Sequence, residues 1–169
     1  VRICLGQGES STPELEPRWQ PLVVQEAWID DASAEDIAWL LDRLRQGGAV
    51  DVACQSLQMK KGRAGVAVTA LVSTEQAQTL RRIWFEAGPS IGLRERQQGR
   101  WLLPRRAGML ATPWGALKAK QVQRPDGRCT VKPEADALQQ LSQTSGCSIA
   151  DLRAAAQVAS FESEEPWTW

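Results

Sequence analysis

The distribution of apolar residues along the chain predicts a β-α-β-β-α-β unit over residues 22–105. Residues 22–29 (LVVQEAWI), 50–57 and 66–72 (VAVTALV) are rich in β-branched and other apolar side chains, which is typical of strands. Apolar residues recur at helical spacing after Ser33 and again after Ser73, so these serines are expected to cap two helices, and glycines end both segments. A long polar strand over residues 91–103 completes the order, which is that of the ferredoxin-like fold.

A smaller second α+β unit is predicted over residues 106–161. Turn sequences containing Pro and Gly separate short strands at residues 107–111, 117–122 and 129–132. Pro133-Glu134 is expected to open a helix at its first position, reaching about Thr144, and a last helix follows over residues 148–160. The Gly-, Ser- and Pro-rich residues 1–21 are interpreted as the end of a preceding region and a linker. Residues 162–169 are interpreted as a flexible acidic tail.

Composition narrows the function classes. Among the 169 residues, 20 Lys and Arg balance 20 Asp and Glu, so a globally basic nucleic-acid-binding protein is not expected. There is no histidine, and the four cysteines form no CxxC pair, so a Cys/His zinc site is not expected and the thiols are predicted to be reduced. Neither a signal-peptide pattern nor an apolar run long enough to span a membrane is visible, which favours a cytoplasmic protein without membrane contact.

A basic turn lies between the two central predicted strands. Residues 58–65 (QMKKGRAG) place Lys60, Lys61 and Arg63 next to Gly62 and Gly65. Glycines allow a backbone to approach an anion closely and the cations neutralise its charge, so the turn is a candidate phosphate-binding loop. The alternative is an ordinary solvated hairpin turn. No Walker A pattern occurs in the chain.

Paired carboxylates follow the first predicted strand. Asp30 and Asp31 precede the first helix, and carboxylates at such a strand end can hold Mg²⁺ or Mn²⁺ alongside substrate phosphates. Alternatively, Asp31 or Ser33 simply caps the helix.

Arginines mark the polar strand. Its period of two places Arg94, Arg96 and Arg100 on one face, where they can bind phosphate or keep an exposed edge strand charged. Lys132 and Glu134 flank a predicted helix N-terminus, which is either an anion site or a simple helix start.

In their order along the chain, these motifs resemble the C-terminal region of the LarC family, the nickel insertion proteins of nickel-pincer nucleotide cofactor synthesis. The resemblance covers about residues 22–158. It rests on Glu26, Ile29, Asp30, Asp31 and Glu35; on Gly48, Ala49, Asp51, Val52 and the loop 58–65; on Gly92, Leu93, Arg94 and residues 100–105; and on Thr112, Pro113, Gly115, Lys118 and residues 131–134 (VKPE).

The resemblance implies a concrete activity for the full-length protein. The family inserts nickel, as substrate, into a pyridinium bisthiocarboxylate mononucleotide, and uses CTP with Mn²⁺ or Mg²⁺. Its C-terminal region is the CTP-binding part, so this region alone is not expected to insert nickel. On this interpretation Lys60, Lys61 and Arg63 face the triphosphate, while Asp30 and Asp31 serve the metal. The further nucleotide-binding candidates are Gly65, Arg94, Arg96, Arg100, Lys132 and Glu134.

The chain departs from the family pattern beside the charged residues. Trp28, Ala32, Ala64 and Ala137 stand where the family has Asn, Met, Pro and part of a Tyr-Glu-Asp run. These departures leave a second hypothesis open, namely a non-catalytic regulatory or oligomerisation module that binds a small anionic effector. A homo-oligomer is expected on either hypothesis. RNA binding is not favoured, because the central strands lack a pair of aromatic residues.

Overall fold

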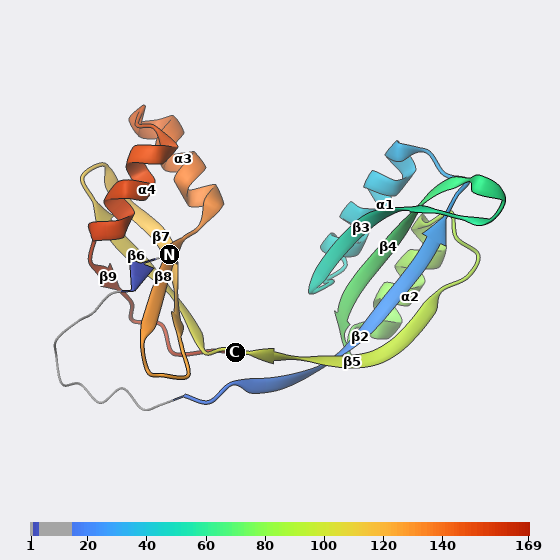
Figure 1. Cartoon of the computed structure of the whole chain (residues 1–169), viewed down its shortest axis with the longest axis horizontal. Coiled ribbons are helices and arrows are strands. Elements are labelled where there is room, and N and C mark those ends of the chain that lie inside the picture. Colours follow the sequence, from blue (N-terminus) through green and yellow to red (C-terminus); the bar gives the residue numbers. More distant parts are fainter. Residues whose placement is uncertain (1, 4–14) are drawn as a thin grey trace. The chain divides into compact units, whose positions relative to one another are not determined.

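The computed structural model describes residues 2–3 and 15–169. The chain divides into two compact units, one of residues Trp19–Arg100 and the other of Val1–Arg18 with Trp101–Trp169 (Figure 1). The division therefore falls at Arg100, whereas the sequence pattern places it at Arg105.

The unit of residues 19–100 has the expected β-α-β-β-α-β order. Its sheet has the strand order β3-β4-β2-β5, which is ferredoxin-like. Its elements are β2 (Arg18–Ile29), α1 (Ala34–Gln46), β3 (Asp51–Gln58), the single 3₁₀ turn η1 (Lys60–Gly62), β4 (Ala64–Ser73), α2 (Ala77–Ala87) and β5 (Arg94–Leu102).

Both helices of this unit cover the same face of the sheet (Figure 1). Alternate strand residues such as Ile29 and Val68 pack against Leu40, Leu44 and other apolar residues of the helices, and form one buried core. The opposite face of the sheet, here called the open face, carries the intervening residues. Polar and charged side chains on β2 and β5 are therefore free to form a site there.

The two helices begin differently. Ser33 caps α1, and the side chain of Asp36 completes a capping box with the Ser33 backbone. The predicted cap at Ser73 is wrong for α2, because this helix starts at Ala77 with Gln76 at the N-cap position. The Ser73 hydroxyl instead accepts a hydrogen bond from the Gln76 N–H at 3.3 Å, within the turn that precedes the helix.

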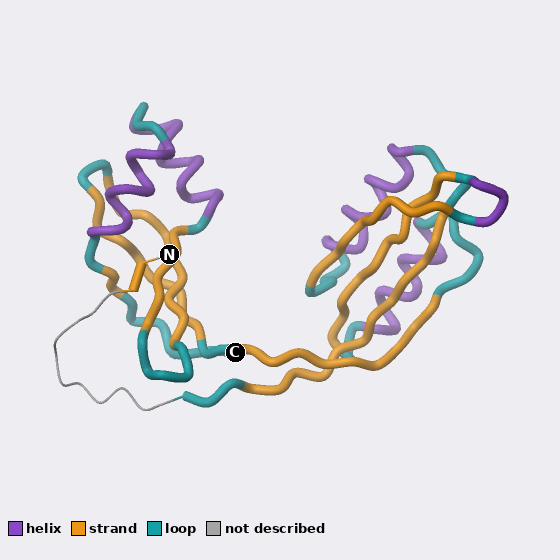
Figure 2. The backbone as a smooth tube through the Cα atoms, in the orientation of Figure 1, coloured by secondary structure: helices purple, strands orange, loops and turns teal. Residues whose placement is uncertain are grey.

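Strand directions bring two distant segments to one end of the sheet. Strand β4 is antiparallel to both β2 and β3, so the end of β2 lies beside the tip of the β3–β4 hairpin. The pairing of Ile29 with Val66 fixes this register. The turn η1 forms the hairpin tip and is drawn as a short purple segment in Figure 2.

The other unit contains a second antiparallel sheet with the strand order β1-β8-β7-β6-β9. Helices α3 and α4 pack on this sheet around a core that includes Leu110, Leu117, Leu138 and Leu152. Its elements are β1 (Arg2–Ile3), β6 (Arg105–Thr112), β7 (Gly115–Gln123), β8 (Cys129–Pro133), α3 (Ala135–Ser145), α4 (Ile149–Val158) and β9 (Phe161–Glu162).

Three further sequence-based expectations differ from the structure. Strand β2 begins at Arg18, inside the expected linker, most of which lies outside the described residues. Pro133 ends β8 and Glu134 is the N-cap of α3, so the proline does not start the helix. The expected flexible tail is ordered by pairing, because Glu162 pairs with Met109 in β6 and Thr168 bridges to Arg105. Its Trp167 ring also lies 4.7 Å from the Arg106 guanidinium.

In the part of the chain that the structure describes, no helix has the length and apolar character needed to cross a membrane.

Candidate functional site

The paired carboxylates and the basic loop meet at one end of the ferredoxin-like sheet. Asp30 follows the last residue of β2, and Arg63 follows η1 at the hairpin tip. The Arg63 Nη1 atom lies 3.3 Å from Asp30 Oδ2 in an ion pair. The Asp30 side chain is only 17% exposed, whereas that of Arg63 is 56% exposed. The fold therefore brings together a carboxylate and a basic loop residue that are 33 positions apart in the sequence.

The loop is a tight turn that presents its cations to solvent. The Met59 N–H donates to the Arg63 carbonyl at 2.7 Å and closes the turn. Within it Lys61 has a φ of 60° and Gly62 a φ of 72°, both in the left-handed region. Lys60 and Lys61 are exposed, and neither belongs to the core of the unit. Because a lysine at positive φ carries a steric cost, the turn holds Lys61 in a conformation that its side chain does not favour.

Gly65 has a structural role at the base of this loop. A Cβ atom at this position would lie 2.8 Å from the Ile29 carbonyl oxygen and 2.8 Å from the Met59 Sδ atom. The glycine therefore allows the start of β4 to approach the end of β2, which holds the loop next to Asp30. A direct contact of Gly65 with a nucleotide stays a prediction.

The two aspartates are not needed for capping α1. The Ser33 hydroxyl accepts the hydrogen bond from the Asp36 N–H at 3.1 Å, so Ser33, and not Asp31, is the N-cap residue. Over residues 2–3 and 15–169, no group of three or more His, Cys, Asp or Glu side chains could hold a metal ion. Asp30 and Asp31 can therefore supply only part of a coordination sphere, and a hard cation there requires further oxygen ligands from a phosphate group or water.

Two of the three arginines of β5 lie near the site on the open face. The Arg94 guanidinium stacks 4.1 Å from the centre of the Trp28 ring, and Arg96 Nη1 lies 4.0 Å from Glu26 Oε2. Arg100 is six residues beyond Arg94, about 20 Å along an extended strand, and its Nε atom donates to Gln20. The strand period thus places the three on one face but distributes them along the whole sheet.

Lys132 and Glu134 belong to the other unit. Lys132 lies opposite Lys120 in the β7–β8 ladder. The Glu134 carboxylate forms an ion pair with the Lys120 ammonium group at 3.1 Å. Neither unit by itself gathers these two residues with the basic loop. Their nucleotide-binding role stays a prediction.

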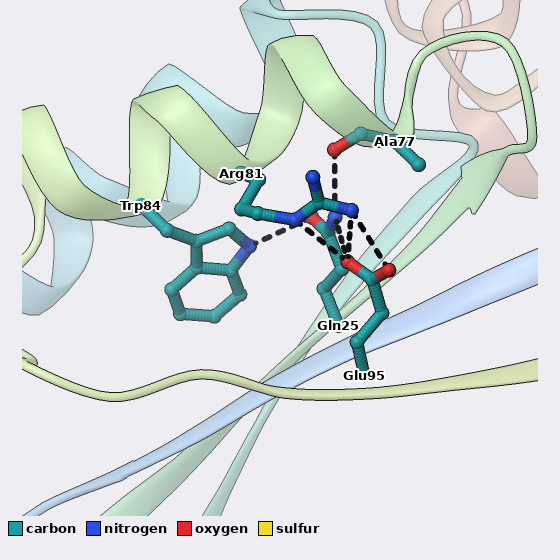
Figure 3. A network of polar contacts seen from close by, with 5 residues as sticks. All are labelled: Gln25, Ala77, Arg81, Trp84 and Glu95. Carbon is teal, nitrogen blue, oxygen red and sulfur yellow. Dashed lines mark hydrogen bonds and ion pairs between the residues drawn. The ribbon is translucent and has the colours of Figure 1, made fainter.

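Sequence reasoning missed a buried polar network behind the arginine strand (Figure 3). Gln25 is fully buried, and its amide donates to the Ala77 carbonyl at 2.8 Å and to Glu95 at 2.9 Å. The Trp84 indole N–H donates to the Gln25 carbonyl oxygen at 3.1 Å, and Arg81 binds both oxygens of Glu95. A glutamine at a position that alternates with the apolar core residues Val23 and Ala27 was the available signal, because a buried amide requires partners.

This network fixes β5 against α2. Hydrogen bonds from Arg81, together with the one from Gln25, hold the pKa of the Glu95 carboxyl below its usual range. Glu95 lies between Arg94 and Arg96 in sequence and points to the helix side of the sheet. Its anchoring therefore turns the two arginines to the open face.

The clefts of this unit include two that bear on a ligand site. The larger, of about 700 Å³, is lined by Trp19, Pro21, Leu22, Thr74, Gln97, Gln98 and Gly99. Its described lining contains no charged side chain, so it does not suit a phosphate group. The smaller, of about 220 Å³, lies on the open face and includes Arg96.

Comparison with known proteins assigns this arrangement to a family. The family model for nickel insertion proteins matches residues 1–153. The chain belongs to this family. It is 34% identical over 118 residues to the pyridinium-3,5-bisthiocarboxylic acid mononucleotide nickel insertion protein of Desulfitobacterium hafniense, covering 70% of this chain and 30% of the relative. A relative from Synechococcus elongatus, whose description also names nickel insertion, is 34% identical over 134 residues, covering 79% of this chain and 33% of the relative. The chain thus spans about a third of the length of these nickel insertion proteins.

A solved structure agrees with the family assignment. The apo form of LarC2, the C-terminal domain of a cyclometallase involved in synthesis of the NPN cofactor of lactate racemase, matches with a TM-score of 0.77 and 26% identity. This match covers 84% of the present chain and 98% of LarC2. A Methanopyrus kandleri protein has the same fold, with a TM-score of 0.62 at 17% identity over 86% of this chain and 97% of its own. The chain therefore corresponds to the C-terminal domain of a nickel insertion protein.

Proposed function

We propose that the unit of residues 19–100 binds CTP together with Mn²⁺ or Mg²⁺, as the nucleotide-binding part of a nickel insertion protein. In the full-length protein this part would support nickel insertion into the pyridinium bisthiocarboxylate mononucleotide. The observation that carries the proposal is the Asp30–Arg63 ion pair, because it puts a carboxylate pair and a basic loop at one end of a sheet.

The donor set fits a metal–triphosphate complex better than a resident metal ion. Asp30 and Asp31 provide two carboxylates, and a hard divalent cation completes its sphere with phosphate oxygens and water. A bound cation would neutralise phosphate charge. Lys60, Lys61 and Arg63 would bind the phosphate oxygens, with Arg63 able to do so through two parallel hydrogen bonds.

The existing ion pair prepares the site for exchange. Arg63 and Asp30 neutralise each other in the free protein. The Arg63 side chain is 56% exposed and can change partners, and the Asp30 side chain, at 17%, is partly open to solvent. On binding, Asp30 would turn to the cation and Arg63 to a phosphate. An ion pair with a solvated partner such as Arg63 contributes only ~0–1 kcal/mol, so breaking it costs little compared with the new charged contacts.

Titration calorimetry tests the proposal on the 169-residue chain. CTP with Mn²⁺ is expected to bind the wild type, and Arg63→Gln is expected to weaken binding at least tenfold, since hydrogen bonds to charged groups contribute ~1.5–3 kcal/mol. Arg82→Gln is the matched control, because Arg82 is an exposed arginine on α2 that pairs only locally with Glu86. Absence of CTP binding at millimolar nucleotide would contradict the proposal.

Sedimentation with and without CTP tests the expected homo-oligomer, and an oligomer whose size does not change with CTP would favour the regulatory-module hypothesis.

A further inference from the structure

The C-terminal residues 160–169, here called the strap, run along the free edge of β6. Strand β9, which belongs to the strap, pairs with Leu110 and Met109 in the middle of β6. Further along, Thr168 and Arg105 exchange two backbone hydrogen bonds of 2.8 Å, one in each direction. The strap is therefore fastened at two separate places on the same strand.

Side chains and a glycine of β6 adapt this strand to the strap. The Arg106 guanidinium lies 4.7 Å from the centre of the Trp167 ring. Gly108 permits the close approach of the strap, because a Cβ atom there would clash with the Glu162 carbonyl oxygen. The edge of β6 is thus shaped to receive this segment.

The end of the strap lies where the chain passes between its two units. The chain leaves the unit of residues 1–18 and 101–169 through residues 15–18 and returns to it through residues 101–105, here called the connecting segments. Thr168 holds the second segment at Arg105, and the Trp169 indole N–H donates to the Glu16 carbonyl oxygen of the first at 2.9 Å. Two consecutive residues of the strap therefore bind both connecting segments.

A buried glutamine of β7 supports the same junction. The Gln123 backbone N–H donates to the Pro104 carbonyl oxygen at 3.0 Å, and its side-chain oxygen accepts from the Leu15 N–H at 3.2 Å. Gln123 is 1% exposed, so its polar groups need these partners inside the protein. Each connecting segment is consequently bound once by β7 and once by the strap.

Strands β2 and β5 continue the connecting segments into the unit of residues 19–100, where they are tied to each other. The Arg100 Nε atom donates to Gln20 Oε1 at 2.8 Å. The Trp19 ring packs directly on Gly99, where a Cβ atom would clash with it. The two connections between the units are therefore a cross-linked pair and not two independent linkers.

We infer that the strap is a conformational device that controls how freely the two connecting segments move. With the strap closed, both segments are held to the second sheet and move as a pair. With the strap released, Arg105 and Glu16 lose these partners and each segment flexes separately. All residues of the strap are exposed or half-buried, and such an edge segment can open while the rest of its unit stays folded.

The inference is independent of the proposed nucleotide binding. The strap lies outside residues 1–153, which the family model matches. Asp30 and Arg63, which carry the proposed function, belong to the other unit. Displacement of the strap would change the mobility of the connecting segments without changing the basic loop.

Amide hydrogen exchange of the 169-residue chain, followed by NMR, tests the closed strap. Thr168→Pro removes the N–H and the hydroxyl that donate to the Arg105 carbonyl oxygen. The Arg105 amide is expected to exchange about tenfold faster or more, which corresponds to the net loss of one to two hydrogen bonds. Thr168→Val is the matched control, because it keeps both backbone hydrogen bonds and is expected to exchange at close to the wild-type rate.

A second variant tests whether the strap acts as one unit. Trp169→Phe removes the indole N–H that donates to Glu16 and leaves Arg105 untouched. Exchange at Arg105 is nevertheless expected to rise, because release of one end of the strap loosens the other. Trp39→Phe, at an exposed tryptophan of α1, is the control and is expected to change nothing at Arg105. An Arg105 exchange rate that is the same in Trp169→Phe and the wild type would overturn the inference.

Nitrogen-15 relaxation measures the consequence for the two units. Their rotational correlation times are expected to shorten and diverge in Thr168→Pro and to stay at the wild-type values in Thr168→Val. Faster exchange at Arg105 with unchanged correlation times would show that the strap is only a local edge strand, and the inference would fail. If Thr168→Pro loses protection throughout β7, its sheet has unfolded and Trp169→Phe decides by the same two measurements. CTP affinity with Mn²⁺ is expected to be equal in all these variants, so absence of CTP binding would contradict the proposed function and leave this inference standing.

Discussion

Arg63 and Asp30 form an ion pair with 3.3 Å between Nη1 and Oδ2 across two segments that are 33 residues apart in the sequence. The contact exists because β4 runs antiparallel to β2 and returns the hairpin tip to the end of β2. A carboxylate and a guanidinium held in this way can either stabilise the fold or serve a ligand. Because Arg63 is exposed, the ion pair adds little to stability, and its main role is to serve a ligand.

Substitution of Asp30 by Asn separates these two uses. The free energy of unfolding is expected to change by less than ~1 kcal/mol, because Arg63 is 56% exposed and stays solvated when its partner loses its charge. CTP affinity with Mn²⁺ is expected to fall at least tenfold, whereas affinity in EDTA is expected to stay equal or rise, since a negative charge near the phosphates is removed. Calorimetry under both conditions measures the difference. Asp42→Asn, which removes an exposed partner of Arg45 on α1, is the control. An equal loss with and without Mn²⁺ would argue against a metal role for Asp30.

The left-handed conformation of Lys61 predicts an opposition between stability and binding. A non-glycine residue at φ near 60° costs roughly 1–2 kcal/mol, so Lys61→Gly is expected to raise the free energy of unfolding by about 1 kcal/mol after the larger entropy of glycine in the unfolded chain is subtracted. The same change removes a cation and is expected to weaken CTP binding. Lys60→Gly loses the same charge without the conformational gain, because Lys60 is not at positive φ. Urea denaturation of both variants measures the difference, and an equal destabilisation would contradict the prediction.

The close approach at Gly65 predicts that a methyl group there displaces the loop. In Gly65→Ala the new Cβ would meet the Ile29 carbonyl oxygen at 2.8 Å, and a backbone oxygen cannot move away as a flexible side chain can. Overpacking of this kind costs ~1–3 kcal/mol. Both stability and CTP affinity are therefore expected to fall. Gly92→Ala is the control, because a Cβ at Gly92 meets nothing within 4 Å. Unchanged affinity in Gly65→Ala would show that the loop does not depend on its contact with β2.

Local signals in the sequence predicted most elements of this fold. The capping box at Ser33 and the glycine after Gln46 set the ends of α1. The start of α2 was misplaced because Ser73 bonds to Gln76 within a turn, and the two arrangements share the same sequence pattern. The composition of the tail predicts flexibility, because its pairing with Arg105 and Met109 is non-local and leaves no mark on a single segment.

The candidate site was predictable as far as it follows from topology. Once the strand order is known, Asp30 and the basic loop must lie at the same end of the sheet. The placement of Arg94 by Trp28 and the burial of Gln25 against Trp84 depend on side-chain packing between segments. Such contacts depend on the positions of several elements at once, so they could not be predicted from composition and periodicity.

The Glu95–Arg81 contact predicts a pH dependence of stability. The pKa of Glu95 is lowered in the folded protein, chiefly by hydrogen bonds from Arg81, so the unfolded state binds more protons when the solution is acidified. The stability that Glu95 contributes is therefore present above the ordinary glutamate pKa of ~4.3 and is lost as the pH falls through the lower value of the folded state. In Glu95→Gln this contribution does not titrate.

The difference between the urea midpoints of wild type and Glu95→Gln is consequently expected to be largest near neutral pH and to shrink below about pH 4. Glu75 and Asp126, whose pKa values are also lowered, are present in both proteins and cancel in this comparison. A difference that stays constant from neutral to acidic pH would show that Glu95 acts through shape and neutral hydrogen bonding. In that case Gln25 and Arg81 would hold β5 without its charge, and the orientation of Arg94 and Arg96 would not respond to pH.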